Sequence, residues 1–316
     1  MALRFDGRVA IVTGAAGGLG RAHALSLAAR GCRVVVNDVG VAFRGDVPAA
    51  EGVVEEIRAA GEEAVADAHD VVEGAAGLVE TALESFGAVD IVINNAGIAT
   101  GTPIGPNAVE EWRPTLETTL QGSIAVTGAA WPHLEASDAG RVVMTASNTA
   151  FGAPHSAAYS TAKSSMYGLT RSLAGEGRRA GIGVNVIMPA AWTRLVQALP
   201  EGPVAEFMER RFTVDAVASF VTWLCHPSCG VSGEAFSVGG GRAARVVLAE
   251  NRGVTIGDGD DPSAWGDLVD GLMATDELAV PLSSNDEVSW LAHTLGGEVP
   301  EAYRPGGSLA WDRKPR

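Results

Sequence analysis

Residues 9–38 follow an order that constrains the fold more than any other part of the chain. A short apolar run at residues 9–12 is typical of a strand buried on both faces of a parallel sheet. The glycine-rich residues 13–20 follow, then a helical pattern, and then a second apolar run at residues 34–36 that closes on Asp38. This order of strand, glycine turn, helix, strand and acid predicts the first βαβ unit of a dinucleotide-binding sheet.

The glycine turn and Asp38 together predict the cofactor. Glycines let the backbone approach a pyrophosphate closely, and the following helix offers free N–H groups at its positive end. Asp38 comes eighteen residues after Gly20 and can accept hydrogen bonds from the hydroxyls of the adenosine ribose. A 2′-phosphate would meet this carboxylate, so we expect NAD and not NADP. Arg21 and Arg44 are the residues whose charge would favour the opposite choice.

Strand and helix patterns continue to alternate along most of the chain. Further strands are expected at residues 64–66, 91–93, 141–145, 184–188 and 235–238, and helices at residues 49–60, 74–86, 110–134 and 214–225. Such alternation implies right-handed crossovers and a doubly wound parallel sheet with helices on both faces. We therefore predict an α/β fold, Rossmann-like, whose ligand-facing residues lie at the carboxyl ends of the strands.

Two stretches depart from this alternation. Residues 190–213 contain two prolines and a glycine and do not fit a sheet, which suggests a flap over the substrate, with a plain surface excursion as the alternative. After residue 242 the alternation stops, and only short helices are expected, at residues 262–273 and 288–295. The predicted organisation is one domain at residues 1–242, which includes the flap, and a C-terminal extension at residues 243–316 that packs on this domain or on a partner subunit.

Tyr159 and Lys163 are the candidate catalytic pair. A spacing of four residues places both side chains on one face of a helix, where an ammonium lies close enough to a phenol to favour its ionised form. Ionisation near neutral pH makes a tyrosine useful as an acid or a base. Lys163 and Lys314 are the only lysines in a chain that otherwise uses arginine, so a compact charge at Lys163 is a specific choice. A tyrosine and a lysine four residues apart are a weak signal by themselves. The prediction is supported because the other candidate residues lie at the carboxyl ends of strands, on the same edge of the expected sheet.

The composition limits which binding partners and which cellular compartment we expect. The 316 residues carry a net charge of −15, which argues against nucleic acid and membranes as partners. The first residues lack the apolar core of a signal peptide, and no apolar run approaches the length of a membrane span. Cys32, Cys225 and Cys229 are too few for a disulfide framework and lack a second pair of metal ligands. We expect a cytoplasmic protein without a metal centre.

Three separated motifs carry a family resemblance. Residues 13–20, Asn94 to Gly97 and Tyr159 to Lys163 stand in the order found in the short-chain dehydrogenase/reductase family, which the chain resembles over roughly residues 5–242. Four further stretches are similar to the (3R)-hydroxyacyl-CoA dehydrogenase unit of peroxisomal multifunctional enzymes of type 2, namely residues 4–9, 35–40, 53–58 and 223–226. Bacterial relatives of that group act on fatty acyl-CoA or on steroids and their side-chain thioesters.

The resemblance implies hydride transfer between a secondary alcohol and NAD. Tyr159 would act as general base in oxidation and as general acid in reduction, while Lys163 would hold the nicotinamide ribose and lower the pKa of the phenol. A serine hydroxyl would hydrogen-bond the reacting oxygen. The residues implied to contact NAD are Gly14, Gly17, Gly18, Leu19, Gly20, Asp38, Asp70, Val71, Asn95, Gly97, Tyr159, Lys163, Pro189 and Thr193.

Two positions depart from the family pattern. The family serine usually lies thirteen residues before the tyrosine, where this chain has Ala146. Our hypothesis is that the intervening loop is one residue shorter and that Ser147 takes the role, with Thr145 or Ser156 as alternatives. The family asparagine that supports a water relay to the lysine falls at Thr119, whose hydroxyl can also hold a water, so Thr119 remains a catalytic candidate.

The resemblance therefore predicts a 3-hydroxyacyl-CoA or a 17-hydroxysteroid as substrate, and a homodimer or homotetramer as assembly. A smaller alcohol or ketone without CoA is the alternative among enzymes, and a non-catalytic NAD-binding regulatory protein is the alternative outside them. The arginines available to contact the phosphates of CoA are Arg178, Arg179, Arg194, Arg210 and Arg211, with an ordinary solvated face as the alternative interpretation of these charges.

Overall fold

The computed structural model describes residues 3–40, 50–99, 101, 103–193, 202–255 and 262–296. The chain divides into two compact units, Met1–Val246 and Val247–Arg316. The first unit carries the large sheet and every site residue named above. The second contains a 3-10 helix and two α-helices, near the stretches predicted to be helical, at Pro262–Leu268, α9 (Val269–Leu272) and α10 (Ser284–Thr294).

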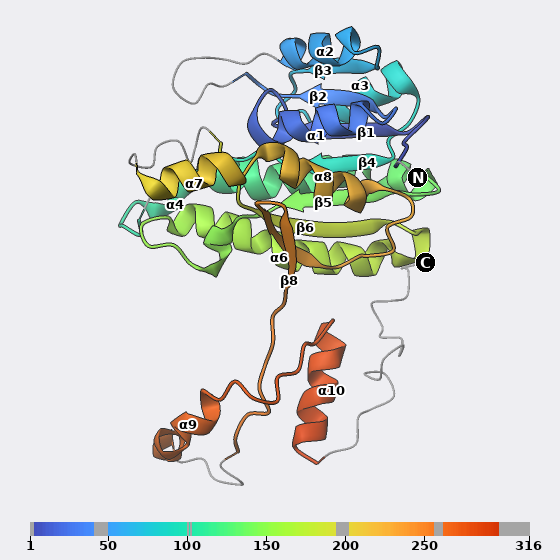
Figure 1. The fold of residues 1–316 in the computed structure, drawn as a ribbon. Helices are drawn as coiled ribbons and strands as arrows, with labels where there is room; N and C mark the ends of the chain where they lie inside the picture. The colour runs from blue at the N-terminus through green and yellow to red at the C-terminus, as the bar shows by residue number, and fades with distance from the viewer. Residues whose placement is uncertain are drawn as a thin grey trace. The chain divides into compact units, whose positions relative to one another are not determined.

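Eight strands of the first unit form one sheet in the order β3-β2-β1-β4-β5-β6-β7-β8 (Figure 1). The first seven are parallel, and β8 is antiparallel to β7. The order reverses between β1 and β4, as in other doubly wound sheets, so the predicted fold class is confirmed. The strands are β1 (Val9–Thr13), β2 (Arg33–Asn37), β3 (Ala64–Asp67), β4 (Ile91–Asn94), β5 (Arg141–Thr145), β6 (Gly183–Pro189), β7 (Ala235–Gly239) and β8 (Arg242–Val246).

Two buried cores, one on each face, hold the helices to the sheet. Successive strand residues alternate between them, since strand side chains point to opposite faces: Val12 belongs to the first core and Ile11 to the second. Because both faces are covered, the strands are apolar throughout. The helices of the first core are α1 (Gly18–Ala28), α2 (Ala50–Ala59) and α8 (Val214–Cys225), and those of the second are α3 (Ala75–Phe86), α5 (Gly122–Ala136) and α6 (Ala157–Gly177).

The eighth strand was not expected from the sequence, which placed the end of the alternation at residue 242. β7 and β8 form a hairpin in which Gly239 pairs with Arg242. The two loop residues, Gly240 and Gly241, have φ angles of 60° and 78°. Positive φ at both positions is what a two-residue hairpin turn of the primed type requires, and glycine supplies it without strain. The double glycine therefore makes a turn here where the sequence suggested only a strand end.

The helical region predicted at residues 110–134 contains a π-helical segment. α4 (Ala108–Leu116) runs into η1 (Glu117–Gln121), which runs directly into α5. The helix type thus changes twice, at Glu117 and at Gly122, within one continuous helical region. Single π-turns inside α-helices are frequent at functional sites, which draws attention to the residues of η1.

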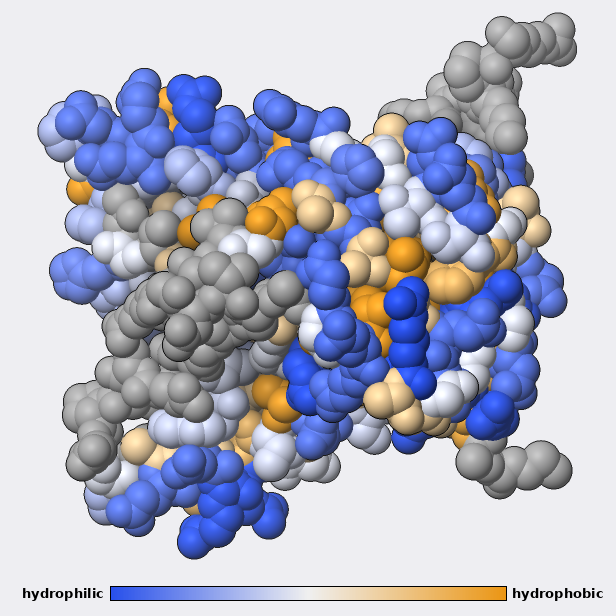
Figure 2. Space-filling model, turned by 90° about the horizontal axis from the view of Figure 1, so that it is seen from above, coloured by the Kyte–Doolittle hydropathy of each residue, from blue (hydrophilic) through white to orange (hydrophobic). Residues whose placement is uncertain are grey.

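Several absences hold for the described part of the chain. No helix there is long and apolar enough to cross a membrane. No group of three or more His, Cys, Asp or Glu side chains there is placed to hold a metal. Cys32, Cys225 and Cys229 are buried free thiols. The face drawn in Figure 2 is mostly hydrophilic, with its apolar residues in small groups.

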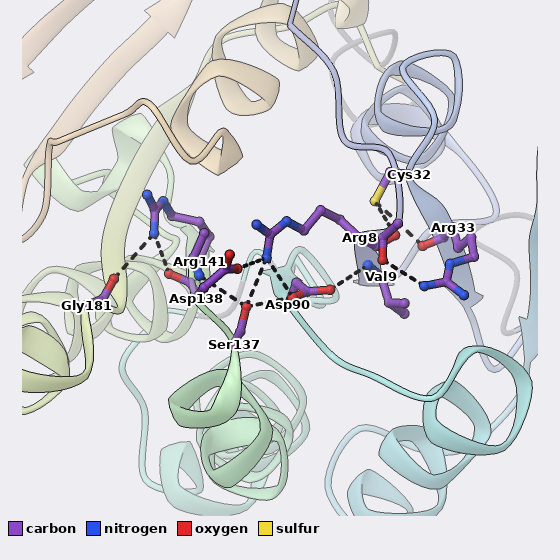
Figure 3. A network of polar contacts seen from close by, with 12 residues as sticks. Arg8, Val9, Cys32, Arg33, Asp90, Ser137, Asp138, Arg141 and Gly181 are labelled. Atoms are coloured by element: carbon purple, nitrogen blue, oxygen red, sulfur yellow. Dashed lines mark hydrogen bonds and ion pairs between the residues drawn. The ribbon is translucent and has the colours of Figure 1, made fainter.

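A polar network joins the amino ends of β1, β4 and β5 (Figure 3). The buried Asp90 carboxylate accepts a hydrogen bond from the backbone N–H of Val9 at 2.9 Å. It also accepts from Arg8 Nη1 at 3.1 Å and from Ser137 Oγ at 2.6 Å. Arg8 makes a second ion pair with the exposed Asp138. Asp90 is therefore the shared acceptor for three donors at this edge.

Asp90→Ala should lower the free energy of unfolding by about 2–4 kcal/mol, because it leaves a backbone N–H and a hydroxyl without their acceptor and removes the buried one of the two carboxylates that pair with Arg8. Asp138→Ala removes only an exposed partner of Arg8 and should cost less than about 1 kcal/mol. Urea denaturation of both variants measures the difference. Equal losses in the two variants would show that Asp90 does not hold this edge together.

Candidate functional site

The carboxyl ends of the parallel strands bring the candidate residues to one edge of the sheet. Gly14, Asp38, Asn95, Ser147 and Pro189 lie at the ends of β1, β2, β4, β5 and β6. The edge includes the point between β1 and β4 where the strand order reverses, which is where doubly wound sheets bind their ligands. The fold therefore places the nucleotide motif and the catalytic motif side by side.

The glycine turn between β1 and α1 depends on close contacts that only glycine permits. A Cβ on Gly20 would lie 2.2 Å from the carbonyl oxygen of Gly14. Gly14 and Gly18 have φ angles of 60° and 52°, in the left-handed region. Gly17 is the N-cap residue of α1, and Leu19 packs against the first core. The turn thus presents backbone and the amino end of α1 in a form that fits a pyrophosphate.

Thr13, the last residue of β1, is a link that the sequence analysis missed. Its hydroxyl accepts hydrogen bonds from the N–H groups of Asn95 and Ala96, both at 3.0 Å. Asn95 Nδ2 in turn donates to the carbonyl oxygens of Thr13 at 3.0 Å and Gly14 at 2.9 Å. These bonds fasten the turn after β4 to the glycine turn, so Asn95 positions the backbone of that turn. A threonine at the end of an apolar strand is the signal that the sequence offers.

Asp38 lies against the glycine turn. Its Oδ2 accepts a hydrogen bond from the N–H of Ala16 at 3.1 Å, and its Oδ1 from the N–H of Gly40 at 2.9 Å. Arg21 binds Glu56 through two nitrogens, at 2.6 and 3.2 Å. Arg21 is therefore already paired with an acid, while Asp38 stays the charged group at the turn. Arg44 lies outside the described residues.

Asp70 and Val71 follow β3 at the same edge. Asp70 Oδ1 accepts hydrogen bonds from the N–H groups of Val72 at 2.7 Å and Glu73 at 3.2 Å, so its side chain stabilises the turn before α3. Val71 is buried against Gly122, where an added Cβ would come within 2.5 Å of Val71 Cγ2. Both side chains have local structural roles, and their place beside an adenine stays a prediction.

Ser147, Tyr159 and Lys163 come together at the carboxyl end of β5. Ser147 caps a 3-10 helix at Asn148–Phe151, where its hydroxyl accepts from the N–H of Thr149 and donates to Asn148 Oδ1, both at 3.2 Å. The same hydroxyl lies close enough to the Tyr159 phenol to lower its pKa. Lys163 Nζ lies 5.7 Å from the centre of the Tyr159 ring, one helical turn along α6. The same ammonium donates to the carbonyl oxygen of Thr145 at 2.7 Å, which ties it to the end of β5.

The shortened loop between Ser147 and Tyr159 contains two left-handed residues. Gly152 has a φ of 97° and His155 a φ of 62°, a conformation that costs free energy for a residue with a side chain. The hydroxyl of Thr145 is buried without a hydrogen-bond partner, so that residue serves the site through its carbonyl. Of the predicted hydroxyls, that of Ser147 lowers the pKa of Tyr159, and its catalytic role stays a prediction.

Thr119 lies in the middle of η1 and close to Lys163. A Cβ on Gly97 would lie 3.1 Å from Thr119 Oγ1 and 3.2 Å from Lys163 Nζ, so both polar groups flank Gly97 and a larger residue there would have to displace them. The Thr119 hydroxyl is buried and has no hydrogen-bond partner within the protein. Buried polar groups need a partner, and this position supports the prediction that Thr119 holds a water near the ammonium.

The segment after β6 returns to the cofactor edge. Pro189 ends β6, and a Cβ on Gly18 would lie 3.9 Å from Thr193 Cγ2. The N–H of Trp192 donates to the carbonyl oxygen of Phe212 at 2.6 Å, which joins the two described ends of the predicted flap. Residues 194–201 of that flap lie outside the described residues, and Arg194 with them.

The arginines proposed for CoA separate into two groups. Arg178 and Arg179 form the turn at the far end of α6, roughly 28 Å from Tyr159 by helical rise, and their contact with CoA stays a prediction. Arg210 and Arg211 end α7 (Pro203–Arg211), next to Phe212 and the end of β7. They remain candidates.

Burial shifts the pKa values of the catalytic pair in opposite directions. It lowers the pKa of Lys163 to about 8. It raises the pKa of Tyr159, an effect that the hydrogen bond from Ser147 opposes. Lys163 therefore still carries its charge at neutral pH. A positive charge beside a phenol favours the ionised form of that phenol, against the effect of burial, and the role of the pair in proton transfer stays a prediction.

Comparison with known proteins shows the family. A family model described as short chain dehydrogenase matches residues 8–201. The chain is 41% identical over 264 residues to peroxisomal multifunctional enzyme type 2 of Mus musculus, a match that covers 82% of this chain and 35% of the mouse protein. The chain therefore belongs to the short-chain dehydrogenase/reductase family, a family of oxidoreductases, and spans about a third of the length of this relative.

Two solved structures extend the comparison. A short chain dehydrogenase from Mycobacterium avium is 39% identical with a TM-score of 0.73, over 87% of this chain and 97% of that one. A 7α-hydroxysteroid dehydrogenase complexed with NADH and 7-oxo glycochenodeoxycholic acid is 27% identical with a TM-score of 0.67, over 75% of this chain and 95% of that one. Both likenesses agree with the family assignment.

Lys163→Met should change how stability depends on pH in the cofactor-free protein. The pKa of Lys163 is about 8 when folded and about 10.4 when unfolded, so between these values the unfolded chain binds more protons and stability rises with pH. From pH 7.5 to 10 the wild type should gain about 1–3 kcal/mol relative to Lys163→Met. Urea denaturation across that range measures this slope. Parallel pH profiles in the two proteins would show that the ammonium is not desolvated.

Proposed function

We propose that this chain is an NAD-dependent oxidoreductase that interconverts a secondary alcohol and a ketone. The observation that carries the proposal is a buried ammonium, Lys163, whose Nζ lies 5.7 Å from the ring centre of a phenol, Tyr159, with the Ser147 hydroxyl near that phenol. A purely structural helix gains nothing from a buried lysine, whereas acid–base chemistry on a carbinol needs one there. Membership of an oxidoreductase family supports the same conclusion.

The residues of the site have distinct tasks in oxidation. Ser147 donates a hydrogen bond to the alcohol oxygen and holds it beside Tyr159, whose ionised phenol takes the hydroxyl proton. Lys163 stabilises the phenolate, and Thr119 holds a water near the ammonium. NAD, when bound, supplies the acceptor for the hydride that leaves the carbinol carbon. In reduction, Tyr159 returns the proton to the carbonyl oxygen.

NAD is the proposed cofactor because of the charges at the glycine turn. The turn itself fits a dinucleotide, since Gly14 and Gly20 approach too closely for any side chain. Asp38 lies against this turn and would repel a 2′-phosphate. Arg21, the cation that would bind such a phosphate, is paired with Glu56. These contacts favour a free ribose hydroxyl over a phosphate.

The proposed substrate is a 3-hydroxyacyl-CoA or a hydroxysteroid. The motifs shared with hydroxyacyl-CoA dehydrogenases support the first, and the likeness to a hydroxysteroid dehydrogenase supports the second. Arg210 and Arg211 are the arginines available at the substrate edge for the phosphates of CoA. A smaller alcohol without CoA remains the alternative within the same chemistry.

The test is a substrate panel with matched variants. We expect NAD reduction with 3-hydroxyacyl-CoA thioesters or hydroxysteroids, a loss of about 10³-fold or more in kcat in Tyr159→Phe, and a loss of about 10²- to 10³-fold in Ser147→Ala. Ser156→Ala is the control for Ser147→Ala and should behave as wild type. NADP should be a poor substitute for NAD. Undiminished turnover in Tyr159→Phe, or NAD binding without turnover of any alcohol, would contradict the proposal and favour a regulatory NAD-binding protein.

A further inference from the structure

A cluster of polar side chains joins the ends of β2 and β3, and no step of the proposed reaction uses it. Asn37 and Asp67, the last residues of the two strands, are paired in register. Both are buried, and His69, two residues after Asp67, has a half-exposed side chain. Asn37 Nδ2 donates to Asp67 Oδ1 at 2.7 Å and to the carbonyl oxygen of His69 at 2.8 Å. The cluster therefore extends from the strand ends into the turn that follows β3.

Asp67 is the acceptor at the centre of the cluster. Its Oδ1 also accepts from the N–H of His69 at 3.0 Å, and its Oδ2 accepts from Thr81 Oγ1 of α3 at 2.7 Å. His69 Nδ1 lies 2.8 Å from the same Oδ2. Burial raises the pKa of Asp67, but the hydrogen bonds from His69, Thr81 and Asn37 outweigh this effect and leave the pKa lowered. An ionised carboxylate only accepts hydrogen bonds, so His69 Nδ1 is the donor to Asp67.

The strand-end part of the cluster lies behind Asp38, the residue predicted to bind the adenosine ribose. The N–H of Asp38 donates to the carbonyl oxygen of Asp67 at 3.0 Å. The carbonyl oxygen of Asn37 accepts from the N–H of Ala15, in the glycine turn, at 2.9 Å. The backbone that carries the Asp38 carboxylate is therefore bound both to the glycine turn and to the end of β3.

The His69 part of the cluster fixes the turn predicted to lie beside the adenine. Asp70 follows His69 directly, and its side chain accepts from the N–H groups of residues 72–73. The imidazole lies against the amino end of α3, where a Cβ on Gly74 would be 2.8 Å from His69 Cβ and a Cβ on Gly77 would be 2.5 Å from His69 Nε2. Figure 1 shows α3 beside β2 and β3. His69 therefore uses its N–H, its carbonyl oxygen and its ring to hold the start of this turn.

We propose that His69, held by Asp67, is a positioning residue for NAD: it fixes the turn at residues 70–73 relative to Asp38, in the arrangement that receives the adenosine half of the cofactor. The inference rests on the proposed function, because it concerns the site proposed for NAD. A turn that is ordered before binding removes the free-energy cost of ordering it when the cofactor binds. The contribution of His69 therefore belongs to NAD affinity and not to the hydride-transfer step.

Removal of the imidazole leaves the rest of the cluster in place. In His69→Ala the Asp67 carboxylate keeps three donors, which are Asn37, Thr81 and the N–H of residue 69. A buried carboxylate with several donors remains satisfied, so this variant should fold. His69→Asn restores a side-chain N–H donor near the position of Nδ1. The two variants therefore differ in whether a side chain at residue 69 still binds Asp67.

His226 is a matched control, because its Nδ1 also bonds a side chain two residues away. Ser228 Oγ lies 2.7 Å from His226 Nδ1. His226 follows α8 in the loop that leads into β7, at the amino edge of the sheet and away from the proposed cofactor site. A histidine that only stabilises a loop should leave NAD affinity unchanged when it is removed.

The test is calorimetric titration of the full chain with NAD and with ADP-ribose, which contains the adenosine half without nicotinamide. We expect Kd to rise by the same factor, about five- to tenfold, for both compounds in His69→Ala. The kcat at saturating NAD should keep its wild-type value, while KM for NAD rises in step with Kd. His69→Asn should recover most of the lost affinity, and His226→Ala should bind both compounds as the wild type does.

Three results would overturn the inference. Wild-type Kd values in His69→Ala, with only a lower free energy of unfolding in urea, would show a purely structural histidine. A similar rise of Kd in His226→Ala would show a general effect of destabilising the sheet. A loss of NAD affinity without a loss of ADP-ribose affinity would place the effect on the nicotinamide half. If the wild type itself binds neither compound, the proposed function fails, and the inference fails with it.

Discussion

The site depends on an ammonium that is buried without a carboxylate partner in the described structure. Lys163 donates to one backbone carbonyl, that of Thr145, and faces Gly97 and the Thr119 hydroxyl. Desolvating a charge costs several kcal/mol. The fold offsets this cost elsewhere, since α6 is packed on the second core along its length and β5 is paired on both sides. The positive charge is then available to the Tyr159 phenol, which is where chemistry requires it.

The amino edge of the sheet contributes mainly to stability, whereas the carboxyl edge carries the candidate functional site. At the amino edge, Asp90 accepts hydrogen bonds from three donors, a backbone N–H, a guanidinium and a hydroxyl. At the carboxyl edge, glycine turns, a left-handed His155 and the unpaired hydroxyl of Thr119 keep groups free or strained. Active sites commonly retain such features at the expense of stability. The stability that the amino edge and the buried cores provide offsets the cost of the strained and unpaired groups at the carboxyl edge.

The parallel sheet could be predicted because its causes are local in the sequence. Continuous apolar runs such as residues 9–12 indicate strands covered on both faces, and glycine at Gly14 and Gly20 indicates a close approach of backbone. The bonds between Thr13 and Asn95 could not be predicted in the same way, because they join residues about eighty positions apart that only the sheet brings together. The family pattern supplied the Asn95 position but not its partner.

Two other features escaped the sequence for different reasons. The π-helical segment around Thr119 shifts side chains by a fraction of a turn, which apolar periodicity does not reveal. The glycines that form the hairpin turn, Gly240 and Gly241, are equally consistent in the sequence with the end of a strand. Both features depend on local geometry in the folded chain, whereas the glycine turn and the pair of Tyr159 and Lys163 could be recognised from the sequence.

The most direct test of the account is the pH dependence of kcat/KM for oxidation of a secondary alcohol with NAD. If the Lys163 charge acts on the Tyr159 phenol, kcat/KM should rise with pH and reach a plateau, with an apparent pKa well below the ordinary phenol value of about 10. Lys163→Met should move that limb to higher pH. A rate that continues to rise tenfold per pH unit beyond about pH 10 in both proteins would contradict the coupling of ammonium and phenol on which the account rests.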